Sequence, residues 1–350
     1  MPYGRLKFGY ENPGVGPSEA FENGILAEKH GFDFFWVGDH FVDLDGARLE
    51  PWTVLSAVAV RTSRIMLGSG VTDPQRTHPS RTAHSVASLD TISGGRAILG
   101  IGAGEAMNVV PFGLPWEKPA TRVRRVAEAI QVIRQLWSSS KVRRVNFSGE
   151  FYSLEEAFLA QSPTQRPHPP IYLGAISGRR MLEVVGRYAD GWYAWLNTPE
   201  TFRERWKTIK SAAAAAGRSA SAIDGSTQLM VAVVRNAAEK RKAFLSAKVT
   251  LVLEKNLLNT LAEGDPVILP QYQNLLASTK SVKEAVRIAG RVPDAVVEKT
   301  AAIGGEEEVR QKVEEFQRAG VNQVTVAELI PPSRPRKMIE FMGRIIRRSG

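Results

Sequence analysis

Two side chains suited to proton transfer follow short hydrophobic runs in this sequence. His40 ends the segment Trp36–His40, and histidine exchanges protons near neutral pH more readily than other side chains. Glu105 follows the run Gly102–Gly104, in which glycines would let the backbone approach a ligand closely. Each residue also has a structural alternative, which is a hydrogen-bonded histidine at a strand end or a glutamate in a helix cap or loop ion pair. We predict that His40 and Glu105 are the catalytic residues.

Two further features are typical of a site that binds an anionic ligand. The segment Gly174–Arg179 opens a predicted helix, and backbone N–H groups at a helix N-terminus bind phosphate well. Arg179 would add a charge-assisted contact, although a simple strand-to-helix turn would have the same composition. Asp39 precedes His40 and would either orient a ligand or brace the structure. The candidate binding residues in the helix-opening segment are Gly174, Ala175, Ile176, Ser177, Gly178 and Arg179.

The absence of cysteine removes several kinds of chemistry. It excludes a thiolate nucleophile, disulfides, cysteine-ligated iron–sulfur clusters and cysteine-based zinc sites. The five histidines stand at positions 30, 40, 78, 84 and 168, with no i, i+4 pair of the kind that ligates zinc. No Gly-x-Ser-x-Gly sequence marks a serine nucleophile. We predict neither a metal site nor a serine triad.

The elements that must position these residues alternate between short β-type runs and longer helical patterns, as in βαβ units. We predict a single-domain (β/α)8 TIM barrel over residues 1–350, with insertions at about 138–170 and 236–300. The first insertion should contain a hairpin near 145–152, and the second should be mostly helical. The predicted strands are 6–10, 34–37, 65–68, 96–101, 171–174, 192–195, 227–234 and 324–329.

An open dinucleotide-binding sheet is the alternative to the barrel. Such sheets carry a complete Gly-rich fingerprint after the first strand, whereas residues 11–16 contain only two glycines. In a barrel, active-site residues lie at the C-terminal ends of the strands. His40, Glu105 and the segment Gly174–Arg179 should therefore meet on one rim.

The charge balance limits the kinds of partner. The chain has 46 basic and 36 acidic residues, a net charge of +10, but the basic residues are spread over several predicted helices. This spread favours solvated helix faces, and a groove that attracts an anionic cofactor is the alternative. We expect a small-molecule substrate rather than nucleic acid, because no nucleic-acid-binding motif accompanies the charge. No run of about 18 apolar residues and no targeting segment is evident, so we expect a cytoplasmic protein without membrane contact.

Several motifs together resemble the coenzyme F420-dependent branch of the luciferase-like hydride transferase superfamily. They are Trp36–His40, Gly70–Pro74, Gly95–Glu105 and Tyr188–Trp192. Within that branch the sequence is most similar to methylenetetrahydromethanopterin reductases and phthiodiolone-type ketoreductases. The resemblance implies a homodimer or higher homo-oligomer that transfers a hydride between the deazaflavin and a C=N or C=O carbon.

The resemblance also implies roles for particular residues. His40 and Glu105 would line the cavity at the hydride-bearing carbon as proton donor or acceptor. A non-prolyl cis peptide at Gly70–Val71 would support the back of the deazaflavin ring. The implied cofactor-binding residues are Asp39, Gly70, Val71, Thr72 and Asn108, together with the segment 174–179.

Three alternative functions stay open at this point. The same barrel could carry FMN as a monooxygenase, or it could bind a cofactor without catalysis. An F420-dependent sugar-phosphate dehydrogenase is also similar at Asp39–Phe41. However, the tryptophan those enzymes place after the histidine is Leu44 here, and their lysine has no counterpart in Leu196–Pro199.

Overall fold

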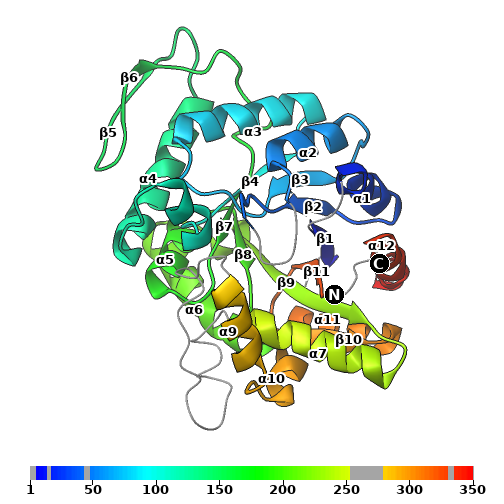
Figure 1. Cartoon of the computed structure of the whole chain (residues 1–350). Helices are drawn as coiled ribbons and strands as arrows, with labels where there is room; N and C mark the ends of the chain where they lie inside the picture. The colour runs from blue at the N-terminus through cyan, green and yellow to red at the C-terminus, as the bar shows by residue number, and fades with distance from the viewer. Residues whose placement is uncertain (1–4, 14–16, 43–47, 253–278, 330–334, 350) are drawn as a thin grey trace.

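A computed structural model describes residues 5–13, 17–42, 48–252, 279–329 and 335–349 (Figure 1). Eight parallel strands close into a barrel, because β9 pairs with β8 on one side and with β11 on the other. The predicted (β/α)8 fold is therefore confirmed. The barrel strands, in spatial order, are β1 (Lys7–Asn12), β2 (Phe34–Val37), β3 (Met66–Ser69), β4 (Ala97–Ile101), β7 (Ile171–Gly174), β8 (Gly191–Ala194), β9 (Asp224–Val233) and β11 (Gln323–Glu328).

A ninth strand of this sheet, β10 (Ala301–Gly304), was missed by the sequence analysis. It pairs with the C-terminal part of β9, from Ala301 opposite Met230 to Gly304 opposite Val233. Because β11 pairs with one edge of β9 over Ser226–Val231, β10 pairs with the opposite edge, beyond the point where its pairing with β8 ends. Its four residues are alanine, isoleucine and glycine, and a short run with two alanines and a glycine carries little β signal.

Helices surround the barrel, and many begin where proline or a polar cap predicts (Figure 1). The Glu50 carboxylate accepts from Thr53 N at 2.7 Å and caps α2, whose first residue is Pro51. The first helix begins at Pro17. The α-helices are α1 (Pro17–Lys29), α2 (Pro51–Ala59), α3 (Pro79–Ser93), α4 (Pro119–Trp137), α5 (Arg179–Tyr188), α6 (Pro199–Ala215), α7 (Ala237–Leu251), α9 (Thr279–Ala289), α10 (Asp294–Thr300), α11 (Glu306–Arg318) and α12 (Pro335–Ser349).

The two segments predicted as insertions differ in form. The first contains the expected hairpin, formed by β5 (Val145–Ser148) and β6 (Ser153–Ala157), which extends away from the barrel (Figure 1). Its turn is held by the Glu128 carboxylate of α4, which accepts from the backbone N–H groups of residues 150–152 at 2.8–2.9 Å. The second segment contributes α7, α9 and α10, while residues 253–278 lie outside the described residues.

The barrel interior is filled by aromatic side chains instead of forming a pore. The fully buried Trp36 ring packs against Tyr193, with ring centroids 4.5 Å apart. The ring lies against Gly68 of β3, where an added Cβ would be 2.3 Å from Trp36 Cζ3. Only glycine leaves room for the indole at this position. The barrel interior below the rim is therefore closely packed.

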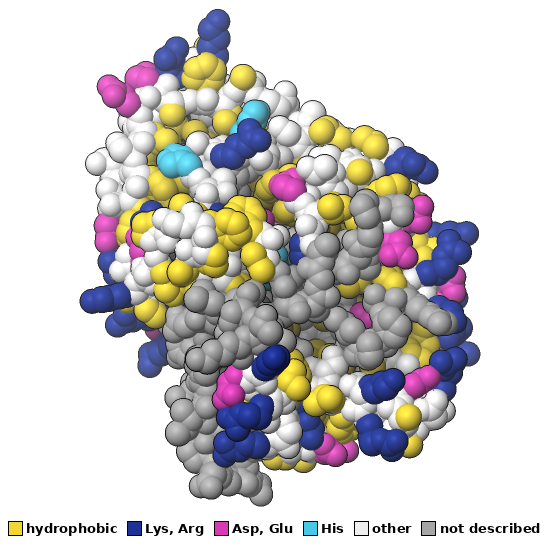
Figure 2. All heavy atoms as spheres, viewed as in Figure 1, with side chains coloured by type: hydrophobic (Ala, Val, Ile, Leu, Met, Phe, Trp, Pro, Cys, Tyr) yellow, Lys and Arg dark blue, Asp and Glu magenta, His cyan; other side chains and the backbone are white. Residues whose placement is uncertain are grey.

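On the visible face, basic side chains are spread among acidic and hydrophobic ones (Figure 2). No helix in the described ranges is long and apolar enough to cross a membrane.

Candidate active site

A cavity of about 840 Å³ opens at the C-terminal ends of the barrel strands, where the sequence places the candidate residues. Twelve of the thirteen predicted site residues line it. They are Asp39, His40, Gly70, Val71, Thr72, Glu105, Asn108, Gly174, Ala175, Ile176, Gly178 and Arg179. Ser177 does not line the cavity, although it stands between residues that do. The tertiary fold therefore brings together side chains that are up to 140 positions apart in the sequence.

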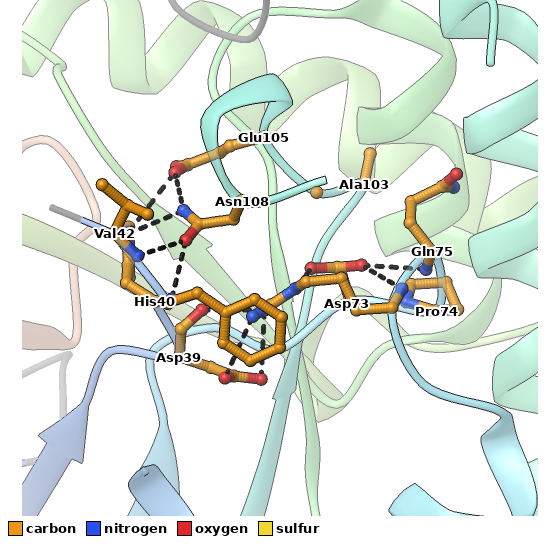
Figure 3. Close-up of polar contacts among 12 residues, drawn as sticks. Asp39, His40, Val42, Asp73, Pro74, Gln75, Ala103, Glu105 and Asn108 are labelled. Atoms are coloured by element: carbon orange, nitrogen blue, oxygen red, sulfur yellow. Dashed lines mark hydrogen bonds and ion pairs between the residues drawn. The ribbon is translucent and has the colours of Figure 1, made fainter. Parts of the chain in front are cut away.

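His40, Glu105 and Asn108 form one contact group at the rim (Figure 3). His40 follows β2, and the other two residues follow β4, with Asn108 in the short 3-10 helix η1 (Ala106–Asn108). His40 Nδ1 lies 3.2 Å from Asn108 Nδ2 and 3.6 Å from Glu105 Oε2. The two predicted catalytic residues are thus neighbours on the cavity wall.

The Asn108 side chain is only 2% exposed, and its amide has little capacity left for a ligand. Its Oδ1 accepts from Phe41 N at 2.7 Å and from Val42 N at 2.9 Å. Its Nδ2 contacts His40 and also lies 3.4 Å from Glu105 Oε2. An amide offers two donors and two acceptor positions, and all four are used here. Asn108 lines the cavity, and its polar atoms contact the two candidate catalytic residues, while its predicted role in cofactor binding stays a prediction.

Asp39 is engaged by Arg76, a residue that the sequence analysis did not single out. Arg76 Nη1 donates to Asp39 Oδ1 at 3.3 Å, Nη2 donates to the Asp39 carbonyl at 2.7 Å, and Nε donates to Asp73 Oδ2 at 2.5 Å. Burial alone would lower the pKa of Arg76, but the charges of Asp73 and Asp39 outweigh it and raise that pKa. The guanidinium also lies over the Phe41 ring, 4.8 Å from its centroid. Arg76 therefore ties the loop after β3 to the end of β2.

The loop after β3 contains the cis peptide bond Gly70–Val71, as predicted. The Val71 side chain faces two glycines, and an added Cβ on Gly102 or Gly174 would lie 2.8 or 3.0 Å from Val71 Cγ2. Thr72 is 2% exposed, and its backbone pairs with the end of β4 by donating to Gly100 O at 2.9 Å. Gly70, Val71 and Thr72 thus line one part of the cavity with backbone and one valine side chain, an apolar surface that could contact the face of a ring.

The N-terminus of α5 also lines the cavity. Gly178 occupies the N-cap position, so no N-cap side chain accepts a hydrogen bond from the first N–H groups of the helix. Arg179 is 85% exposed, pairs with Glu183 on the next turn, and lines the cavity together with Arg180. Helix N–H groups, a glycine and two arginines are a donor set that fits a phosphate.

One cavity carboxylate, Glu11, was missed by the sequence analysis. It stands two residues after Gly9 in β1, on the same inward-facing side of the strand, and it accepts a hydrogen bond from the Tyr193 hydroxyl. Burial and the charge of Glu11 raise the pKa of Tyr193 well above its ordinary value, so the phenol stays a donor. Burial also raises the pKa of Tyr10 and Tyr172, the other two strand tyrosines with carboxylate partners. A glutamate near the end of a mostly buried strand was the sequence signal that could have identified Glu11 as a site residue.

Within the described ranges no group of three or more His, Asp or Glu side chains is arranged to hold a metal ion.

A match to the family described as luciferase-like monooxygenase covers residues 8–323. The chain belongs to this family. The 5,10-methylenetetrahydromethanopterin reductase of Archaeoglobus fulgidus is 30% identical to it over 331 residues, which cover 92% of each chain.

Two solved structures of the luciferase-like fold are also similar. An F420-dependent secondary alcohol dehydrogenase, in complex with an F420-acetone adduct, has a TM-score of 0.83 at 25% identity and covers 99% of this chain and 100% of that one. The coenzyme F420 dependent tetrahydromethanopterin reductase from Methanopyrus kandleri has a TM-score of 0.79 at 27% identity, over 97% and 98% of the two chains. The family resemblance stated from the sequence is confirmed, and this luciferase-like chain is an oxidoreductase.

Proposed function

We propose that this protein is a coenzyme F420-dependent oxidoreductase that transfers a hydride between the deazaflavin and a C=N or C=O carbon. The observation that carries the proposal is the cavity itself, which brings together the Gly70–Val71 loop, the N-terminus of α5 and the neighbouring His40 and Glu105 side chains. The similar enzymes named above support F420, and two of the three act on a methanopterin. We therefore favour a methylenetetrahydromethanopterin reductase-like activity over ketone or alcohol chemistry.

The residues present fit the cofactor. Gly70 and Val71 would support one face of its ring, Asp39 and Thr72 would border it, and the segment Gly174–Arg179 would hold its phosphate. The two arginines beside that segment suit an anionic arm. When bound, a reduced deazaflavin supplies two electrons as a hydride, a reaction that needs no redox-active side chain from the protein.

The chain's own residues would act on the substrate atom next to the hydride-accepting carbon. His40 lines the cavity and can donate a hydrogen bond to a carbonyl oxygen or an imine nitrogen. Glu105 and Glu11 also line the cavity, and either carboxyl group could hold the proton that balances the hydride. The apolar lining residues Val249, Met230 and Leu329 would exclude water from the reacting centre.

The alternative is an FMN-dependent monooxygenase, because the matching family is described as luciferase-like monooxygenase.

We also propose that the protein works in the cytoplasm as a homodimer or higher homo-oligomer, as expected from the sequence.

Reconstitution tests the choice of cofactor. Apo-protein is titrated separately with F420 and with FMN, and turnover is followed with methylene-tetrahydropterins and with ketones. We expect F420 to bind and support hydride transfer, whereas tight FMN binding with oxygen consumption would refute the proposal. His40→Ala and Glu105→Ala should each lower kcat by about 10²-fold. His84→Ala, an exposed histidine on α3, is the matched control and should leave kcat unchanged.

A further inference from the structure

The orientation of the Asn108 side-chain amide is determined by the turn after His40 (Figure 3). The backbone N–H groups of Phe41 and Val42 point at one amide atom, at 2.7 and 2.9 Å. A backbone N–H can only donate, so that atom must be the amide oxygen. The amide nitrogen then necessarily faces the His40 ring and the Glu105 carboxylate.

This orientation has a consequence for the His40 ring. An amide nitrogen only donates, so at 3.2 Å from Asn108 Nδ2 the His40 Nδ1 atom must accept. In a neutral imidazole with Nδ1 as acceptor, the proton is on Nε2. Glu105 Oε2, 3.6 Å from Nδ1, would favour the opposite tautomer, but it is 3.4 Å from the same amide and can accept the second N–H there.

We propose that Asn108 is a positioning residue that holds His40 as the neutral Nε2–H tautomer. His40 then serves as a hydrogen-bond donor to the substrate oxygen or nitrogen, and it is not the group that gives up a proton. A neutral ring that lost its Nε2 proton would become an imidazolate, which is far less stable near neutral pH. The balancing proton therefore comes from a carboxyl group, and a neutral histidine that polarises a carbonyl is an established catalytic device. This inference rests on the proposed function only for the identity of the substrate atom.

The tautomer can be measured directly in the unaltered protein. Protein labelled with ¹⁵N in its five histidines gives ring signals whose shifts distinguish Nδ1–H, Nε2–H and the imidazolium. The His40 signal is assigned by its loss in His40→Asn. We expect Nε2–H for His40 at pH 8 to 9, and a wild-type His40 protonated at Nδ1 would overturn the proposal. This measurement needs neither cofactor nor substrate, so it remains decisive if the F420 assignment fails.

Asn108→Asp changes the donor while keeping the shape. One carboxylate oxygen can still accept from Phe41 N and Val42 N, but the other can only accept from His40 Nδ1. We expect Nδ1 to become protonated and kcat to fall by about 10²-fold, with less than a twofold change in cofactor Kd. An unchanged His40 tautomer with unchanged kcat would overturn the proposal. A loss of cofactor affinity that accounts for the whole loss of activity would do the same, since Asn108 would then be a cofactor ligand.

Asn197→Asp is the matched control. Asn197 is also an amide with 2% exposure, its Oδ1 accepts from Arg205 Nη1 at 2.6 Å, and it does not line the cavity. This variant introduces a buried carboxylate beside an arginine, so it should change neither the His40 signal nor kcat. If Asn108→Asp does not fold, the wild-type tautomer measurement still decides the proposal.

Discussion

Arg76 is the residue whose removal should most affect the architecture of the site. Its guanidinium makes three hydrogen bonds, to the Asp39 carboxylate, the Asp39 carbonyl and the Asp73 carboxylate. The side chains of Arg76, Asp73 and Asp39 are 4%, 4% and 14% exposed. Breaking a buried ion pair by removing one partner costs about 3–5 kcal/mol, because an uncompensated charge is left behind.

The partners that remain to Asp73 and Asp39 indicate where in the range of about 3–5 kcal/mol the cost of Arg76→Met should lie. Asp73 keeps two backbone donors, Gln75 N at 2.8 Å and residue 76 N at 3.0 Å, so it remains partly satisfied. Asp39 loses both carboxylate contacts to Arg76, but it is the more exposed of the two acids and can reach water. We therefore expect the free energy of unfolding to fall by about 3 kcal/mol, at the lower end of the range.

Urea unfolding at neutral pH, followed by tryptophan fluorescence, measures this change. Asp39→Asn in the Arg76→Met background should recover part of the loss, because it removes the uncompensated charge. Arg125→Met removes an arginine whose partner Glu117 lies outside the cavity lining, and it serves as control for the loss of one ion pair. A loss below about 1 kcal/mol for Arg76→Met, or no recovery in the double variant, would refute this account of the network.

Three other predictions concern packing, alkaline stability and anion binding. Gly68→Ala forces a methyl group into the Trp36 ring and should cost about 1–3 kcal/mol in urea unfolding, whereas Gly178→Ala, with nothing within 4 Å, should cost little. The unfolded chain loses phenolic protons from about pH 10, while the three strand tyrosines keep theirs when folded. The free energy of unfolding should therefore fall above pH 10 by about 1.4 kcal/mol per pH unit for each, and Tyr193→Phe should make that slope shallower. Arg179→Met should weaken binding of a phosphate-bearing cofactor several-fold at low salt and much less at 0.5 M salt, and equal losses at both would argue against a charge contact.

The barrel and most of its rim could be predicted from the sequence because their signals are local. The alternation of short β runs with helical patterns indicates parallel βα units, and a barrel places every strand's C-terminal end on one side. His40 and Glu105 each follow such a run, so their convergence followed from the fold class alone. The strand β10 was missed because a four-residue run with two alanines and a glycine carries almost no periodic signal.

Tertiary structure decided how the polar side chains are partnered. Nothing in the local sequence indicates that Arg76 engages Asp39, or that both ends of the Asn108 amide are used within the protein. Glu11 entered the site because alternate residues of β1 face the barrel interior, and that alternation is hidden when both faces of a strand are buried. Hydrogen bonds depend on atoms brought within about 3 Å across the sequence, so residue types determined the available chemistry and the fold determined which groups share it.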